Sequence, residues 1–380
     1  MSEETFNTAV IDNGTGTIKA GLAGHEKPDV KFPTIVGRPK YKGNVPHQQN
    51  EEEDEEEVYV GDSGSGSAVL TFSSPISRGQ IENWDDMVKV WQHTFENELR
   101  IESDETPVLI TEPPLNPRVA REKTAQIFFE TLNVPGYFVQ VSAILSLFAS
   151  GRTTGIVLES GAGVTQVVPV YEGYSLLHAT EKYNFAGSDL NEWMLKILGE
   201  SGLTLTSFSE KEIARQIKEQ YSYVCMDYEA ELKKAKQTNQ IEVNHTLPDG
   251  NIFAVNEERF RCPELLFHPE MNNFEQEGIH QLIFNAIMKT DIDLRKDLYR
   301  NIVLAGGSTC FKGLSDRLEK EITQLAPPAI TVKVTAPDER KYAAWIGGSM
   351  FAALDSFVEQ CVTQDEYDES GPIIIERKCL

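Results

Sequence analysis

The chain has 380 residues, of which 40% are hydrophobic and 9% aromatic, and its 35 basic and 59 acidic side chains give a net charge of −24. This length exceeds what one core usually accommodates, so we expect two or more domains. A surface this acidic repels nucleic acids and anionic membranes, so we expect neither as a partner.

The cysteines and the start of the chain indicate the compartment. The five cysteines, at positions 225, 262, 310, 361 and 379, form no CxxC pair or Cys/His cluster, which argues against a disulfide framework and a zinc site. The first residues lack the basic segment and apolar core of a signal peptide. No stretch reaches the roughly twenty apolar residues that span a bilayer. We therefore expect a reduced, cytoplasmic protein.

The first predicted elements are strands over residues 8–11 and 17–22, joined by a glycine turn. Residues 40–67 lose all periodicity and contain seven consecutive acids at 51–57. Because such charges repel one another and resist packing, we expect a mobile, solvated loop here. The alternative is a landing site for a basic partner.

Helical spacing of apolar residues predicts a helix over residues 83–99, followed by a strand over 108–111 and a helix over 118–132. The apolar stretch at 138–149 predicts a buried helix, near 141–149. After a flexible break at 151–155, we expect helices over 189–199 and 210–236, a strand over 301–304 and a helix over 313–325. This alternation predicts α/β lobes with central sheets.

An internal repeat is the most informative feature of the sequence. Ile11-Asp12-Asn13-Gly14-Thr15-Gly16-Thr17 is echoed by Leu158-Glu159-Ser160-Gly161-Ala162-Gly163-Val164. One copy alone is typical of a tight hairpin, in which glycine supplies the positive φ angles. Two copies favour a pair of hairpins whose backbone N–H groups hold a phosphate chain from both sides.

Other residues near the repeat fit the same chemistry. Asp12 and Glu159 would hold Mg²⁺ through its waters, and Lys19 would place a charge on the phosphates. A third glycine turn, from Val303 to Thr309, leaves a strand and suits a nucleoside close to the backbone, although alone it is also compatible with an ordinary turn. The chain has no Walker phosphate-binding motif.

Longer segments resemble actins over nearly the whole chain. They comprise residues 20–24, 33–39, 83–87, 111–117, 145–155, 258–264, 336–341, 345–349 and 366–372. The resemblance implies the α/β actin-like ATPase fold, with two lobes that each have a central mixed sheet and flanking helices, and the nucleotide in the cleft between them. The implied parts are a first lobe core (1–33, 75–149 and 343–380), a small inserted subdomain with the acidic loop (34–74), a second lobe core (150–185 and 275–342) and its inserted subdomain (186–274).

The resemblance also implies ATP or ADP with Mg²⁺ as cofactors and assigns roles to matching positions. Contacts with the phosphates and the metal-bound waters fall to Asp12, Gly14, Thr15, Gly16 and Lys19. The opposing turn comprises Glu159, Gly161, Ala162 and Gly163. The base, the ribose and the purine pocket fall to Gly187, Arg215, Lys218, Glu219, Gly306, Gly307, Ser308, Phe311 and Lys341.

The chain departs from the actin pattern at the hydrolysis groups. Glu159 replaces an Asp, and Ala162 replaces an acid between the two glycines. Ser142 stands where actins place a Gln that orients the attacking water, and Gln166 stands where they have a His. Because an amide does not take a proton at neutral pH, we expect retained binding with very slow or absent hydrolysis. The alternative is a rearranged water network in which Ser142 and Gln166 cooperate.

The segments that resemble filament contacts differ as well. The tip loop is longer and acidic, and residues 270–275 contain two amides where actins have an apolar plug. The leading hypothesis is therefore a cytoskeletal structural subunit of a specialised filament or a larger assembly, such as an axonemal motor or a nuclear remodelling complex. The alternatives are a conventional filament-forming actin that hydrolyses ATP on polymerisation and, more remotely, a small-molecule kinase of the same superfamily.

Overall fold

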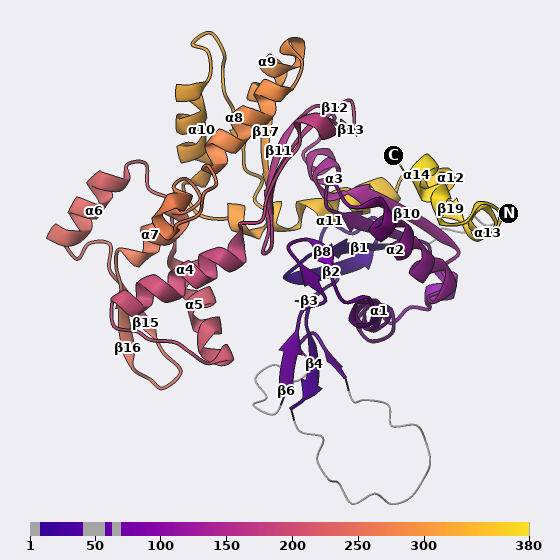
Figure 1. Cartoon of the computed structure of the whole chain (residues 1–380), viewed down its shortest axis with the longest axis horizontal. Helices are drawn as coiled ribbons and strands as arrows, with labels where there is room; N and C mark the ends of the chain where they lie inside the picture. The colour runs from indigo at the N-terminus through magenta and orange to yellow at the C-terminus, as the bar shows by residue number, and fades with distance from the viewer. Residues whose placement is uncertain (1–7, 41–57, 63–69, 380) are drawn as a thin grey trace, which may run out of the picture. The chain divides into compact units, whose positions relative to one another are not determined.

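The computed structural model describes residues 8–40, 58–62 and 70–379 (Figure 1). The acidic run at 51–57 lies outside the described residues. The chain divides into two compact units, Met1–Ser142 with Gly348–Leu380 and Ala143–Gly347. Each unit is described by itself, and the four-part division implied by the actin resemblance stays a prediction.

The first unit is built on a six-stranded mixed sheet with the order β19-β10-β9-β1-β2-β3. Its strands are β1 (Ala9–Asn13), β2 (Thr17–Leu22), β3 (Val30–Pro33), β9 (Val108–Glu112), β10 (Gly136–Val141) and β19 (Val362–Thr363). The strands β1, β9 and β10 are parallel, whereas β2, β3 and β19 are antiparallel to their neighbours. The central strands are buried on both faces, so they form near-continuous apolar runs.

Smaller sheets and helices complete the first unit. The strands β4 (Val36–Pro39), β5 (Tyr59–Val60) and β6 (Leu70–Ser73) form one small sheet, and β7 (Ile76–Ser77) pairs with β8 (Gln80–Ile81). The helices are α1 (Trp84–His93), α2 (Arg118–Glu130), α12 (Phe357–Gln360), α13 (Gln364–Ser370) and α14 (Ile375–Lys378). Two helices, α3 (Ser142–Ala149) and α11 (Ala343–Ala352), contain the points at which the chain passes from one unit to the other. Aromatic contacts join α1, α2 and the sheet, since the Phe128 ring lies 4.9 Å from Trp91 and 5.4 Å from Tyr137.

The second unit has its own mixed sheet, with the order β13-β12-β11-β17-β18 and β14 also paired with β12. Its strands are β11 (Gly155–Ser160), β12 (Thr165–Tyr171), β13 (Tyr174–Ser175), β14 (Glu181–Tyr183), β17 (Ile302–Ala305) and β18 (Val334–Thr335), and β15 (Val243–Thr246) and β16 (Ile252–Val255) form a separate hairpin. Its helices are α4 (Gly187–Glu200), α5 (Phe208–Tyr221), α6 (Tyr228–Gln237), α7 (Glu258–Glu264), α8 (Ile279–Lys289), α9 (Ile292–Arg300) and α10 (Leu314–Leu325).

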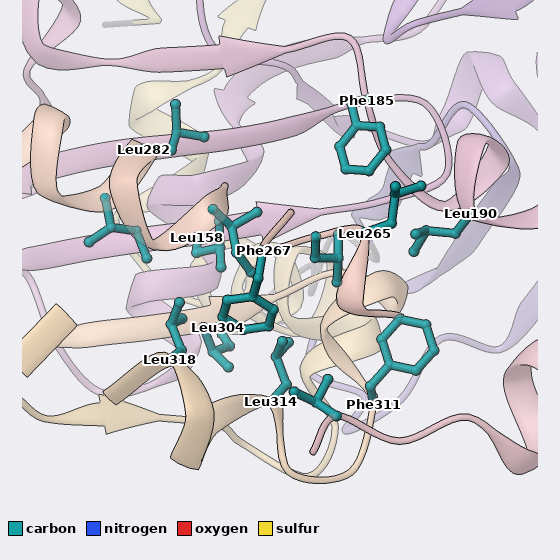
Figure 2. Close-up of a cluster of buried hydrophobic side chains, with 14 of the residues drawn as sticks. Leu158, Phe185, Leu190, Leu265, Phe267, Leu282, Leu304, Phe311, Leu314 and Leu318 are labelled. Atoms are coloured by element: carbon teal, nitrogen blue, oxygen red, sulfur yellow. The ribbon is translucent and has the colours of Figure 1, made fainter. Parts of the chain in front are cut away.

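The core of the second unit lies where its strands meet its helices (Figure 2). Leu158 and Leu304 come from the sheet, Leu282 from α8 and Leu318 from α10, and all four are fully buried. Burial of each such side chain contributes about 1.5–3 kcal/mol. The adjoining glycine turns are therefore held on a rigid base.

The two units repeat one strand arrangement. In the first unit the hairpin β1–β2 is extended by the parallel strand β9, and in the second unit the hairpin β11–β12 is extended by the parallel strand β17. The hairpin registers place Asp12 opposite Lys19 and Glu159 opposite Gln166. The predicted α/β class, with mixed central sheets flanked by helices, is thereby confirmed.

Two predicted helices were wrong in part. Residues 138–141 of the stretch at 138–149 belong to strand β10, because they pair with β9, and the predicted buried helix is α3 over Ser142–Ala149. The predicted helix over 210–236 is two helices, since the main chain between them bonds elsewhere. The amide of Val224 donates to the Lys312 carbonyl at 2.8 Å, and Asp227 then caps α6.

Two further predictions differ in detail. The helix over 83–99 is α-helical only to His93 and continues as a π-helix over Thr94–Leu99. The start of this π segment coincides with the hydroxyl of Thr94, which donates to the Val90 carbonyl at 2.8 Å. Within the predicted loop at 40–67, Tyr59–Val60 form strand β5, because Val60 is buried against β4.

Candidate functional site

The first hairpin places a buried carboxylate beside a cation. Asp12 ends strand β1 with 7% of its surface exposed, and Lys19 lies opposite on β2. The Lys19 Nζ atom donates to Asp12 Oδ2 at 2.6 Å. The Thr111 hydroxyl, from the end of the neighbouring strand β9, donates to Asp12 Oδ1 at 2.8 Å and accepts from the Asn13 amide at 3.0 Å. Both oxygens of the Asp12 carboxylate are therefore held in place.

The turn of this hairpin requires glycine at one predicted position. A Cβ on Gly14 would lie 2.5 Å from the Thr17 carbonyl oxygen and 3.3 Å from Lys19 Nζ. The Gly14 carbonyl accepts from the Thr34 hydroxyl at 2.7 Å, and the Gly16 carbonyl accepts from the Thr34 amide at 3.2 Å. The Thr15 hydroxyl accepts from the Gly79 amide at 3.0 Å. These hydrogen bonds from Thr34 and Gly79 hold the turn in its conformation.

The second hairpin carries an amide where the first carries a cation. Gln166, 3% exposed, donates from Nε2 to Glu159 Oε2 at 2.8 Å. Below the turn, the hydroxyls of Ser160 and Thr165 lie 2.7 Å apart. The Gly161 amide donates to the Val164 carbonyl at 3.0 Å, across the turn. This hairpin therefore has the geometry of the first hairpin but a different charge.

Three turns of the second unit meet at the Gly161 carbonyl. It accepts from the Ser308 hydroxyl at 2.7 Å and from the Gly187 amide at 3.0 Å, while the Ala162 carbonyl accepts from the Ser188 amide at 2.8 Å. Gly187 has no room for a side chain, because a Cβ there would lie 2.6 Å from Ser308 Oγ. The structure thus brings together predicted residues that are far apart in the sequence.

The third glycine turn leaves strand β17 in a conformation that only glycine adopts readily. Gly306 has φ +86°, and a Cβ there would lie 2.3 Å from the Ser160 carbonyl oxygen. Its amide donates to the Arg340 carbonyl at 2.9 Å, next to the predicted Lys341. Lys341 itself lies beside Gly307, with its closest atoms 4.0 Å from the position of a Cβ there. This turn therefore adjoins the second hairpin.

Of the residues predicted to contact the base, Lys218 lies at these glycine turns. Lys218 is 6% exposed and donates to the Gly187 carbonyl at 3.1 Å, and burial lowers the pKa of its ammonium. Arg215 pairs with Glu219 at 2.7 Å and also with Glu212, which sequence reasoning missed. Phe311 belongs to the hydrophobic core (Figure 2). Lys218 thus joins the turns, whereas Arg215 and Glu219 form a half-exposed ion pair.

The two predicted hydrolysis positions differ in their surroundings. Ser142 is the first residue of α3 and is 6% exposed, in the unit that contains Asp12. Gln166 lies within the second hairpin. Thr111 and Thr34 were missed by the sequence reasoning. For Thr111 the available signal was its place at the end of the predicted strand over 108–111.

No group of three or more His, Cys, Asp or Glu side chains that could hold a metal directly occurs among residues 8–40, 58–62 and 70–379. In the same residues no helix is long and apolar enough to cross a membrane.

A family model described as Actin matches residues 3–380, nearly the full chain. The chain belongs to the actin family. Members of this family generally bind ATP or ADP with Mg²⁺ and work in protein assemblies. Actin-family membership implies nucleotide binding.

The residues present fit a nucleotide with Mg²⁺. At Gly161 and Gly307 a Cβ would meet no protein atom nearer than 4.0 Å, and neither glycine has a positive φ. The protein's own packing therefore does not demand glycine there, whereas a ligand lying on the backbone would. Carboxylates such as those of Asp12 and Glu159 suit the waters of a bound Mg²⁺, and an ammonium such as that of Lys19 suits a phosphate.

Proposed function

We propose that the chain is a structural actin-family subunit that binds ATP or ADP with Mg²⁺ and hydrolyses ATP very slowly or not at all. The observation that carries this proposal is the hydrogen bond from Gln166 to Glu159 across the second hairpin, at 2.8 Å. It ties the side chain at a hydrolysis position to the carboxylate that would hold the metal waters.

Binding is supported by groups in both hairpins. In the first, Lys19 and the turn at Gly14 would meet the phosphates, and Asp12 would hold metal-bound waters. In the second, Glu159 would do the same, and Gly161 and Gly307 would leave room for the ligand. Mg²⁺, when bound, would neutralise charge on the phosphates. The turn at Gly306 and the ammonium of Lys218 would face the nucleoside.

Weak hydrolysis is supported by what the side chains can do with a proton. The Gln166 amide does not accept a proton at neutral pH, so no general base is present at this position. Ser142 is short and 6% exposed, so its hydroxyl reaches less far than an amide would. Loss of general base catalysis alone typically lowers a rate by about 10²–10⁴-fold.

The proposed role in an assembly follows from retained binding without turnover. A ligand that binds only the folded chain stabilises it by mass action, so bound nucleotide would act as a folding cofactor. The alternative function is a conventional actin that hydrolyses ATP as it polymerises. A pelleting assay with ATP, Mg²⁺ and salt separates the two.

The assay is paired with identification of the nucleotide. Purified chain is incubated with ATP, centrifuged, and both fractions are analysed for protein, ATP, ADP and phosphate. Protein that holds intact ATP and has released no phosphate supports the proposal, whether it is found in the pellet or in the supernatant. Pelleted filaments that contain ADP and have released phosphate would establish the conventional ATPase instead.

A further inference from the structure

A histidine of the second unit packs its ring against the segment that leads into its own helix. His280 is the second residue of α8, and its ring stacks on that of Phe267, with the ring centroids 5.8 Å apart and the planes at 25°. A Cβ on Gly278 would lie 2.7 Å from the Cε1 atom of His280, so the ring also lies against the main chain just before the helix. A proton taken up by this ring would therefore place a charge inside a close contact.

The α7–α8 segment, residues 268–278, is held to the second unit at its ends and by one aromatic side chain. The Ile279 amide donates to the Leu266 carbonyl at 2.9 Å, which joins the two ends of the segment. Between these ends, the ring of Phe274 lies 5.0 Å from that of Phe185 in the hydrophobic core. The stacked rings of the preceding paragraph flank the segment on either side, so they belong to the same closure.

The surroundings of the stacked rings offer no unengaged acid to a charged histidine. The charged and titratable groups there come from α7, α10 and the segment itself, and they are Glu264, Arg317, Glu321, His268 and Glu270. Arg317 already places a cation over the Phe267 ring, 4.8 Å from its centroid. The acids pair with Arg317 or His268, at 2.7 Å for Glu321 and 2.9 Å for Glu270.

Two further features favour the neutral form of the ring. The first turn of a helix carries the positive end of the helix dipole, and His280 lies in the first turn of α8. Burial lowers the pKa of His280 below its ordinary value of 6.5, and the charges of His268 and Arg317 lower it further. The closed segment thus disfavours a protonated ring at this position.

We propose that protonation of His280 opens the α7–α8 segment, which makes this segment a pH-sensitive element of the second unit. In the opened segment the ring meets water and takes up a proton at its ordinary pKa. A group whose pKa is lower in the closed state stabilises that state above its ordinary pKa, and this contribution is lost as pH falls. Opening would present Met271 and Phe274, which pack against the core in the closed state. The inference does not depend on nucleotide binding.

The test follows amide hydrogen exchange of the full-length chain at about pH 7.5 and about pH 5.5, with each rate divided by the rate of the same peptide in the unfolded chain. With a pKa of 6.5 in the opened segment, one proton raises the opened population at most about tenfold over this range. We expect the protection of the Met271, Phe274 and Ile279 amides to fall about threefold to tenfold. Helix α9 contains no histidine and is the internal reference, with protection constant within about twofold.

Two histidine variants separate the effect of His280 from a general effect of acid. His280→Phe keeps a ring on Phe267 but takes up no proton, so the pH dependence of the segment should disappear. His268→Gln removes the half-exposed histidine that contacts Glu264 and Glu270, and the pH dependence should remain. A native chain without pH dependence in this segment, or full dependence in His280→Phe, would overturn the inference.

A measurement on the native chain covers the case in which His280→Phe does not fold. Exchange of the Cε1 hydrogen of each histidine, followed by mass spectrometry, gives the pKa of each ring in the folded chain. We expect the pKa of His280 to lie below its ordinary value of 6.5. A pKa at or above that value contradicts the inference, because the closed segment would then not resist protonation.

Discussion

Gln166 donates to Glu159 at 2.8 Å at the same register position of the second hairpin at which Lys19 donates to Asp12 at 2.6 Å in the first. The repeated hairpins thus share a cross-strand contact but differ in charge. In the first hairpin the acid contacts a cation, and in the second it contacts a neutral amide. The first hairpin therefore offers a cation to a phosphate, which the amide of the second hairpin does not.

The first prediction concerns recovery of hydrolysis. The double variant Ser142→Gln/Gln166→His supplies a longer amide and a group that can accept a proton near neutral pH. We expect it to release phosphate from bound ATP at least about tenfold faster than the native chain, since general base catalysis contributes about 10²–10⁴-fold. Phosphate release is measured after a single ATP loading.

The single variants are the controls for this prediction. Gln166→His alone is expected to give part of the gain, and Ser142→Ala none. If the native chain already releases phosphate as fast as the double variant, the present side chains suffice and the loss of hydrolysis groups has no consequence.

The second prediction compares two lysines that face each other on neighbouring strands. Lys19 and Lys31 are paired in the β2–β3 register, but Lys19 contacts Asp12 whereas Lys31 is exposed. Lys19→Met removes a charged phosphate contact worth about 1.5–3 kcal/mol, so we expect ATP affinity to fall about 10- to 150-fold. Lys31→Met removes the same charge and leaves the affinity within about twofold. Equal losses in the two variants would mean that only overall charge matters.

How far the sequence predicts the structure depends on the kind of signal. The glycine hairpins were predicted because turn chemistry is local, and their strands lie within one or two residues of the predicted bounds. The start of the stretch at 138–149 is harder to predict, because an apolar run has no periodicity that separates a buried strand from a buried helix. Residues 138–141 form a strand because they pair with β9, and this pairing is a tertiary contact.

The candidate site shows the same division. Gly14 and Gly161 belong to a repeated motif and were found from it. Thr111 belongs to no motif, and its relation to Asp12 exists only through the register of two strands that are far apart in the sequence. The spacing of residues in the sequence therefore predicts the turns but not the side chains that neighbouring strands contribute.

The third prediction uses the cysteines. Burial raises the pKa of Cys225, Cys262 and Cys361 to about 12 and that of Cys379 to about 11, while Cys310 alone of the five is exposed. Because the thiolate is the reactive form, a maleimide should label Cys310 first in the native chain and all five thiols after unfolding. Mass spectrometry of the labelled peptides identifies the sites.

The same labelling tests the third glycine turn as a nucleotide contact. Cys310 follows this turn directly, and its Sγ lies 3.9 Å from the Gly306 carbonyl oxygen. We expect saturating ATP with Mg²⁺ to slow labelling of Cys310 severalfold, and Cys310→Ser to abolish the fast phase. Labelling that ATP leaves unchanged would argue against a nucleotide at this turn.

The fourth prediction concerns a buried ion pair in the second unit. Arg317 donates to both oxygens of Glu264, at 3.0 and 3.3 Å, and also to the Cys225 carbonyl at 2.8 Å. Glu264 is fully buried, and without Arg317 its remaining ion-pair contact is the half-exposed His268, at 3.7 Å. Arg317→Met is therefore expected to cost about 3–5 kcal/mol near neutral pH. Urea unfolding measures this loss, and Glu264→Gln/Arg317→Met should recover part of it.

The pH dependence of this variant has a defined sign. Burial raises the pKa of Glu264 above its ordinary value of 4.5, and Arg317 opposes that shift. A carboxyl whose folded pKa is raised contributes stability below its unfolded pKa and loses that contribution as pH rises through the folded pKa. Without Arg317 the folded pKa rises further, so the stability gap between the variant and the native chain should narrow as pH falls towards about 5. A gap that widens at low pH would contradict this account.

The central claim, retained binding without turnover, is tested most directly by the fate of a single ATP. The native chain is loaded once with ATP labelled in its γ-phosphate, freed of excess nucleotide, and incubated with Mg²⁺ and polymerising salt beside a filament-forming actin. We predict that the chain keeps intact ATP bound while the reference actin releases its phosphate. Phosphate release at the rate of the reference actin would contradict the account.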